Sequence, residues 1–187
     1  QRVGIGYALA GVVGVGLGIL VGKSLVAFRS LDPIFQVLRT IPPLAWLPLS
    51  LATFNQAQPS GIFVIFMTSI WPTLINTAFG VMSLPVDHRN VARVFRFSRF
   101  KYLTKVLLPY SMPHILTGLR LSMGVAWMVI VAGEMLAGGI GIGFFVWDSW
   151  NALSLERVLS AILLIGVVGL LLDRAFESVG RRFAYGS

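Results

Sequence analysis

Five long apolar runs constrain the fold of this chain more than any other feature. They cover approximately residues 3–21, 31–54, 61–82, 112–136 and 159–172. A bilayer has a hydrocarbon core of ~30 Å, which a helix of ~20 apolar residues can cross. The last run is short, but apolar residues extend it from Arg157 to Phe176. The sequence therefore predicts an all-α fold, a polytopic transmembrane helical bundle with five visible spans.

The composition excludes a soluble globular domain. Hydrophobic residues make up 56% of the chain and charged residues only 12%, and the mean hydropathy is +0.83. A soluble domain has about a quarter charged residues. The net charge of +8 would indicate nucleic acid on a soluble protein. In a membrane protein it indicates basic cytoplasmic loops instead, so we expect no nucleic-acid partner and a lipid bilayer as surroundings.

The segments that join the apolar runs alternate between basic joints, which contain Lys and Arg, and bare joints, which contain neither. Lys23 and Arg29 lie in the first joint, six Lys and Arg residues lie in residues 87–105, and three Arg residues lie in the tail. The joints at 55–60 and 137–151 contain none. Cytoplasmic loops carry an excess of Lys and Arg. We therefore predict a multi-pass membrane protein whose bare joints face outside and whose C-terminus is cytoplasmic.

The long basic joint, residues 83–110, has helical spacing and predicts two short helices beneath the membrane. Asn90 is a candidate cap for the first helix, Ser98 is placed to break or recap it, and Pro109 is expected to end the second. One interpretation is an amphipathic pair lying on anionic lipid headgroups. The other is a docking element for a soluble partner, with aromatic side chains as anchors.

This joint resembles the cytoplasmic EAA loop of ABC-importer permeases, whose motif reads E-A-A, three residues, G, nine residues, I-x-L-P. Here Asn90, Val91 and Ala92 stand at the first three positions, Arg96 at the glycine, and residues 106–109 at the end. In that family the loop inserts into a groove on the ATPase subunit. The resemblance thus implies these ATPase-coupling residues: Asn90, Val91, Ala92, Arg93, Phe95, Arg96, Leu108 and Pro109.

The resemblance extends over the whole chain. "LDPIFQVLRTIPPLAWLPLSL" and "TGLRLSMGVAWMVIVAGEMLAGGIGIGFFVWDSWN" are similar to permeases of the nitrate/nitrite and bicarbonate importers, in a group that also takes up cyanate, taurine and sulfonates. It implies a MetI-like ABC importer permease, a single domain over residues 1–187 with residues 83–110 as its coupling loop. Such permeases usually have six spans, so we expect a further N-terminal span.

The same resemblance implies a location in the bacterial inner (plasma) membrane, partners and a function. It implies a second permease copy, two ATPase subunits or domains, and an external solute-binding protein. This chain itself is expected to bind no cofactor, because ATP and Mg belong to the partner subunits. The expected function is a translocation path for a small inorganic anion, foremost nitrate/nitrite, with bicarbonate, cyanate or sulfonate as alternatives.

The second run is broken by Pro42, Pro43 and Pro48. Each proline removes a backbone donor, and unpaired backbone at membrane depth is tolerated only where protein buries it or water lines it. The run is therefore interpreted either as a kinked gate helix beside a pore or as a rigid packing kink. Two further candidates have the same two kinds of interpretation: Arg39, as a pore or snorkelling cation, and Trp46, as a plug or packing residue.

Polar side chains inside later spans add pore candidates. Asn76 needs a partner in lipid, which a neighbouring helix or a solute path supplies. Arg120, Trp127 and Glu134 are spaced by seven and share one helical stripe. We expect this stripe to line the pore, with Arg120 attracting the anion and Glu134 acting as an outer gate or tie. The alternatives are a snorkelling Arg120 and a Glu134 that caps amides of the glycine-rich joint.

No catalytic machinery stands out. The chain has no Cys and two isolated His residues, so no metal site is predicted. "GGIGIG" lacks the Lys-Ser/Thr that follows a phosphate-binding loop. An intramembrane enzyme needs a nucleophile–base or paired-carboxylate set, and none is found. A non-transport membrane scaffold is the remaining alternative from another class.

Overall fold

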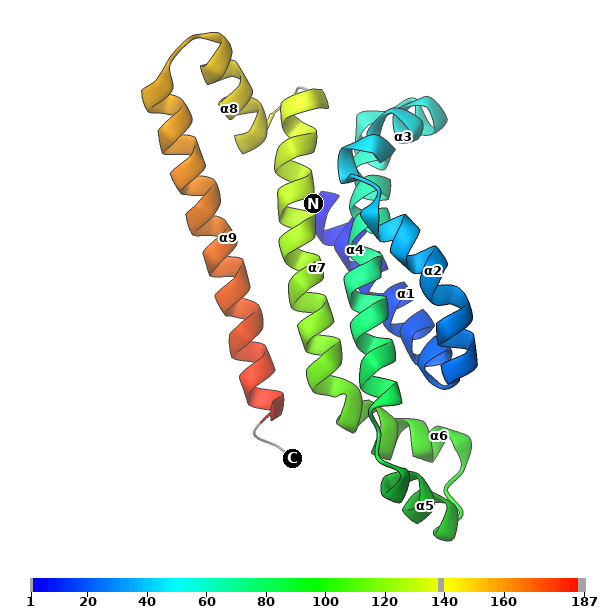
Figure 1. Ribbon diagram of the computed structural model, residues 1–187. Helices are drawn as coiled ribbons and strands as arrows, with labels where there is room; N and C mark the ends of the chain where they lie inside the picture. Colours follow the sequence, from blue (N-terminus) through cyan, green and yellow to red (C-terminus); the bar gives the residue numbers. More distant parts are fainter. Residues whose placement is uncertain (1, 138–139, 185–187) are drawn as a thin grey trace.

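The computed structural model describes residues 2–137 and 140–184, and within them every regular element is helical (Figure 1). The elements follow one another as α1 (Arg2–Gly22), α2 (Leu25–Thr40), η1 (Pro43–Ala45), α3 (Trp46–Phe54), α4 (Ala57–Met82), α5 (Val86–Val94), α6 (Arg99–Tyr102), η2 (Leu103–Leu107), α7 (Leu108–Ala137), α8 (Ile142–Asn151) and α9 (Leu155–Ala184). The predicted all-α fold is confirmed.

Four of the five expected spans are confirmed, and the remaining one is a bent pair of helices. Four helical stretches are long and apolar enough to cross a membrane: Val3–Gly22, Ala57–Met82, Arg99–Leu136 and Leu155–Gly180. The pair Leu25–Thr40 and Pro43–Phe54 passes the same test jointly but is bent by 82°. It makes a fifth span if the bent pair is counted as one.

Helix α4 is the centre of the bundle, and α1 lies directly against it. Glycine or alanine faces α4 at every fourth residue of α1, at Gly6, Ala10, Gly14, Gly18 and Gly22. A Cβ added at Gly18 would lie 2.6 Å from the Cβ of Thr77 and 2.7 Å from the carbonyl oxygen of Leu74. Small residues let helix backbones approach closely, which gives good packing in lipid. This stripe therefore fixes α1 on α4.

Helix α7 packs on α4 through small residues and buried hydroxyl groups. A Cβ at Gly118 would lie 2.9 Å from the Cβ of Asn76. The hydroxyl groups of Thr73 and Ser122 are 2.6 Å apart, and that of Ser122 donates to the carbonyl oxygen of Ser69 at 2.5 Å. The buried hydroxyl groups of Thr73 and Ser122 thus satisfy one another and the backbone, which offsets the cost of placing them in apolar surroundings.

Successive joints lie at opposite ends of the bundle (Figure 1). The α1–α2 joint, α5, α6 and the end of α9 lie at one end, and α3 and α8 lie at the other. All three basic joints thus share one end and both bare joints share the other, as the charge pattern predicts. A single orientation in the membrane requires all basic joints to lie on one side and all bare joints on the other.

The basic joint departs from the expectation in two details. Helix α5 begins at Val86 after Pro85, so Asn90 lies within the helix and does not cap it. Pro109 does not end a helix, because α6 continues through the π-helical turn η2 into α7. The amide of Leu108 donates to the carbonyl of Leu103, and such a wider turn accommodates a proline that lacks its own donor. Ser98 caps α6 as expected.

Candidate functional site

The break between α2 and α3 opens the interior of the bundle. After Thr40 the backbone of Ile41 has φ −64° and ψ 122°, outside the helical region. Pro42 enforces this, because the residue before a proline is disfavoured in a helix. Pro43 then begins η1, where its missing N–H costs no hydrogen bond. The prolines of the second run thus turn the chain within the span and leave space beside it.

That space is a cavity of about 440 Å³ between α2, η1, α4 and α7. Its volume lies in the range of small-ligand sites. Most of its wall is apolar, contributed by residues such as Met67, Ile75 and Val125. The side chains with polar groups that line it are Arg39, Thr40, Thr68, Trp71 and Asn76. A mainly apolar wall with a few polar groups is typical of a binding site.

Among the described residues, Arg39 is the one charged side chain that lines this cavity. It forms no hydrogen bond or ion pair within the described part of the chain. It lies in the last turn of α2, where the carbonyl groups without intrahelical donors favour a cation. Its positive charge is therefore available to a ligand.

Trp71 supplies an unused donor in the same cavity. Its indole N–H is buried and has no acceptor among the described residues. Phe35 of α2 is buried and packs on this indole, with ring centroids 6.0 Å apart. A buried donor without an acceptor is costly and therefore marks a position where an acceptor is expected.

Asn76 and Thr68 are held by their own helix. The side-chain amide of Asn76 donates to the carbonyl oxygen of Pro72 at 2.8 Å. The hydroxyl group of Thr68 donates to the carbonyl oxygen of Val64 at 2.8 Å. Pro72 lacks the amide that would pair with the carbonyl of Thr68. The cavity wall on α4 is thus polar where the proline interrupts the ladder.

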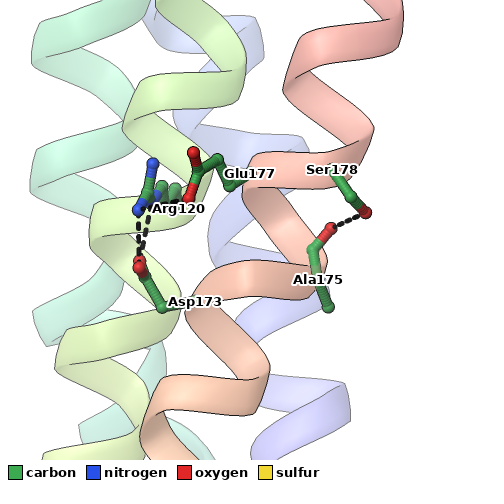
Figure 2. A network of polar contacts seen from close by, with 5 residues as sticks. All are labelled: Arg120, Asp173, Ala175, Glu177 and Ser178. Carbon is green, nitrogen blue, oxygen red and sulfur yellow. Dashed lines mark hydrogen bonds and ion pairs between the residues drawn. The ribbon is translucent and has the colours of Figure 1, made fainter.

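Arg120 lies elsewhere, in an ion-pair network with α9 (Figure 2). Its Nε and Nη2 atoms donate to the two carboxylate oxygens of Asp173, both at 2.5 Å, and Nη2 is 3.5 Å from Glu177. A bidentate pair of this kind is strong and directional. The charge of Arg120 is therefore already balanced by two carboxylates, and its role as an anion-attracting pore residue stays a prediction.

The other candidates also contact protein groups. The indole N–H of Trp127 donates to the carbonyl oxygen of Ile165 in α9 at 3.2 Å. Trp46 packs edge-on against Phe63, with centroids 6.4 Å apart. Glu134 accepts a hydrogen bond from the amide of Gly143 at 3.0 Å, the contact expected of the capping alternative. Residues 138 and 139 of the glycine-rich joint lie outside the described residues.

The structure thus divides the candidates of the membrane interior into two groups. Arg39, Pro43 and Asn76 line one cavity. Three others lie along α7 and bind α8 or α9: Arg120, Trp127 and Glu134. Sequence reasoning missed Trp71, because a tryptophan in a span is usually a packing residue. It also missed Asp173 as the partner of Arg120, although an acidic residue late in the last run was visible.

The basic joint forms a second candidate site at the end of the bundle. Val91, Val94 and Phe95 of this joint are 54%, 78% and 70% exposed. Ala92 is buried instead, at 5%. Cations surround these side chains, and the flanking cavity of about 370 Å³ is lined by Arg89, Arg93, Arg96 and Arg99. Exposed apolar side chains rimmed by charge are typical of a protein-interaction surface.

The turn after α5 supports the comparison with the EAA motif. Arg96 stands at the glycine position of that motif and has φ of 48°, the left-handed region that glycine favours. The amide of Arg96 donates to the carbonyl of Arg93, and the amide of Phe97 donates to that of Ala92. These two bonds form the helix-ending motif in which glycine is common. Arg96 therefore has the backbone conformation that a glycine adopts without strain, at the position where the motif has glycine.

The base of the joint is anchored in the bundle. Leu84 and Leu107 form a buried cluster with Val81, at 3%, 2% and 1% exposure. The hydroxyl group of Tyr110 also donates to the carbonyl oxygen of Ser83 at 3.1 Å. A force applied to α5 would therefore be transmitted to α4 and α7.

Comparison with known proteins identifies similar chains. Residues 14–185 match the family described as "Binding-protein-dependent transport system inner membrane component". A nitrate import permease protein, NrtB of Leptolyngbya laminosa, is 58% identical over 97% of this chain and 65% of its own length. A bicarbonate transport system permease protein, CmpB of Synechococcus elongatus, is 51% identical over 92% of this chain and 63% of its own length. The chain spans just under two thirds of these relatives.

The fold has a solved counterpart. A chain of the methionine ABC transporter MetNI, in an inward-facing conformation, aligns with a TM-score of 0.84 over 97% of this chain and 91% of its own length. The sequence identity is 13%, so this likeness concerns the fold alone.

Proposed function

The chain belongs to the family of binding-protein-dependent transport system inner membrane components, and on that premise we propose that it is a permease subunit of an ATP-driven ABC importer. We propose nitrate or nitrite as its solute. The observation that carries this proposal is the 58% identity to a nitrate import permease over 97% of the chain. Bicarbonate is the second candidate, because a bicarbonate permease is 51% identical over 92% of the chain.

The proposed complex contains a second permease copy, two ATPase subunits or domains, and an external solute-binding protein. In this arrangement the basic end of the bundle and the C-terminus are cytoplasmic. The chain itself binds no cofactor, because ATP and Mg are bound by the ATPase. It performs no chemistry of its own and converts an ATPase movement into alternating access.

Residues 83–110 are the proposed coupling loop within a single permease domain. Its exposed valines and Phe95 fit a groove on the ATPase, and its cations fit an acidic rim. The anchored base supports this role, since a coupling element must transmit displacement without yielding. The residues proposed for coupling are Asn90, Val91, Ala92, Arg93, Phe95, Arg96, Leu108 and Pro109.

Within the membrane, we propose different roles for the two groups of candidates. Arg39, Pro43 and Asn76 line the translocation path, because they share a cavity of suitable size. The remaining candidates fasten helices beside that path, because each contacts another part of the bundle: Trp46, Arg120, Trp127 and Glu134.

The test is transport by the complete complex. The full-length permease is reconstituted in proteoliposomes with its ATPase subunits and binding protein, and uptake of ¹⁵N-nitrate and ¹³C-bicarbonate is measured. We expect nitrate uptake that requires ATP and the binding protein, with a variant ATPase that cannot hydrolyse ATP as control. Uptake of bicarbonate alone would replace the first candidate with the second. Uptake of neither would refute both.

A further inference from the structure

We propose that the cavity between α2, α4 and α7 contains a binding subsite for a small planar oxyanion with a single negative charge. The guanidinium group of Arg39 is its charged donor, and the indole N–H of Trp71 is its second donor. The inference rests on the proposed function and adds to it a position in the membrane where the solute binds.

The charge of the cavity lining favours a monovalent anion. Arg39 is the one charged side chain that lines it, and no carboxylate competes for this cation within the described part of the chain. In surroundings of low dielectric constant an unbalanced charge is expensive. One guanidinium balances one negative charge, whereas a divalent ion such as sulfate keeps a net charge. The subsite should therefore bind monovalent anions more tightly than divalent anions.

The shape of the donor favours a planar oxyanion. A guanidinium group presents a rigid fork of N–H donors that matches two oxygen atoms on one central atom. Nitrate, nitrite and bicarbonate each present such a pair. The wall beside Arg39 is mainly apolar, which excludes ions that keep a tight water shell more than it excludes nitrate.

Trp71 completes the subsite from the opposite helix. Its indole N–H has no acceptor in the described ranges 2–137 and 140–184, and an oxygen atom of the anion would provide one. Phe35 packs on the indole and lies one helical turn before Arg39 on α2. A movement of α2 would therefore displace Arg39 together with the ring that packs on Trp71, which couples binding to the position of this helix.

The first experiment measures binding without transport. The chain contains no Cys, so one introduced cysteine is unique within it. Ile41→Cys places a thiol on the cavity wall, and Val26→Cys on the exposed part of α2 is the control. We expect nitrate to slow labelling of residue 41 by a charged thiol reagent about tenfold at saturation, equimolar sulfate to have little effect, and residue 26 to be unaffected. Adding Arg39→Gln should abolish the protection.

Equal labelling of residue 41 with and without nitrate would overturn the subsite. Equal protection by sulfate would overturn the charge argument and with it the proposal. Neither result depends on uptake, so the subsite can fail while nitrate import by the complex is demonstrated. Conversely, protection can be observed even if the reconstituted complex imports only bicarbonate.

The second experiment measures transport by variants of the same complex. Arg39→Gln should lower the maximal rate of nitrate uptake about tenfold, and Arg39→Lys should recover part of it, because lysine keeps the charge but not the fork. Trp71→Phe, which removes only the indole donor, should lower the rate about threefold. Arg29→Gln, ten residues earlier on α2, is the matched control. Unchanged uptake by Arg39→Gln would refute the proposal.

Discussion

The contact of α1 with α4 and the contact of α9 with α7 join helices in the membrane by opposite means. In a bilayer the hydrophobic effect does not drive helices together, because lipid tails are as apolar as the side chains. Helices therefore associate through close packing or through polar contacts. α1 uses a stripe of glycine and alanine, and 28% of its most apolar stretch is buried. α9 has 6% buried and binds α7 through Arg120, Asp173 and the indole of Trp127.

This difference shows what each contact tolerates. Close packing requires small side chains where the two helices meet, so any larger side chain in the stripe must push the helices apart. The α7–α9 contact depends on a few polar atoms and leaves most of α9 exposed, with Leu163 at 70% and Leu171 at 62%. The first contact is therefore sensitive to size and the second to charge.

The largest effect is expected from Gly18→Leu in the α1 stripe. The new Cβ would lie within 2.7 Å of the carbonyl oxygen of Leu74, so the variant should lose about 3 kcal/mol of stability. Thermal unfolding in nanodiscs measures this loss. Gly16→Leu is the control, because a Cβ there meets no atom within 4 Å. Equal losses in the two variants would remove the stripe as the cause.

A smaller effect is expected when the ion pair of α9 is broken. Arg120→Ala leaves Asp173 and Glu177 without this cation, and Asp173→Ala leaves Arg120 only the longer contact with Glu177. Either change should lower the melting temperature and nitrate uptake. The double variant should lose less than the sum of the two, because neither member of the Arg120–Asp173 pair is then left without the other. Arg174→Ala, on the neighbouring exposed residue, is the control.

This cycle also tests the pore role predicted for Arg120. If Arg120 attracts the solute, the double variant transports no better than Arg120→Ala alone. Partial recovery of uptake in the double variant supports a fastening role. Strict additivity of the two stability losses would show that the pair contributes no coupling.

A third effect concerns the end of α7, where both kinds of contact meet. Glu134→Ala removes the acceptor for the amide of Gly143 and should cost about 1–2 kcal/mol. Glu134→Gln keeps an acceptor oxygen and should cost less. Thermal unfolding separates the two variants, and equal losses would assign the effect to the charge of Glu134 instead of its hydrogen bond.

The smallest effect is expected from Trp127→Phe. The change removes the donor to the carbonyl oxygen of Ile165 and keeps most of the ring area, so the loss should be about 0.6 kcal/mol. Trp150→Phe in α8, where the side chain is 56% exposed, is the control. A loss as large as that of Gly18→Leu would contradict the small contribution expected of this single hydrogen bond.

Part of the fold and of the site could be predicted from sequence because it depends on local chemistry. Span length, the proline break after Thr40 and the cap at Ser98 each follow from a few neighbouring residues. The end predicted at Pro109 was wrong, because a π-helical turn absorbed the proline and the helix continued. The partner of Arg120 was missed, since a carboxylate 53 residues away carries no sequence signal of its proximity.

By itself the sequence determined the class of protein, the number of spans and the alternation of basic and bare joints, because hydrophobic length and loop charge act within single segments. The tertiary structure decided which of the charged side chains have ion-pair partners. Arg39 and Arg120 look alike in the sequence, as single arginines in apolar runs. Only the packing of the helices shows that α9 neutralises Arg120, whereas Arg39 lines a mainly apolar cavity and has no partner among the residues that the structure describes.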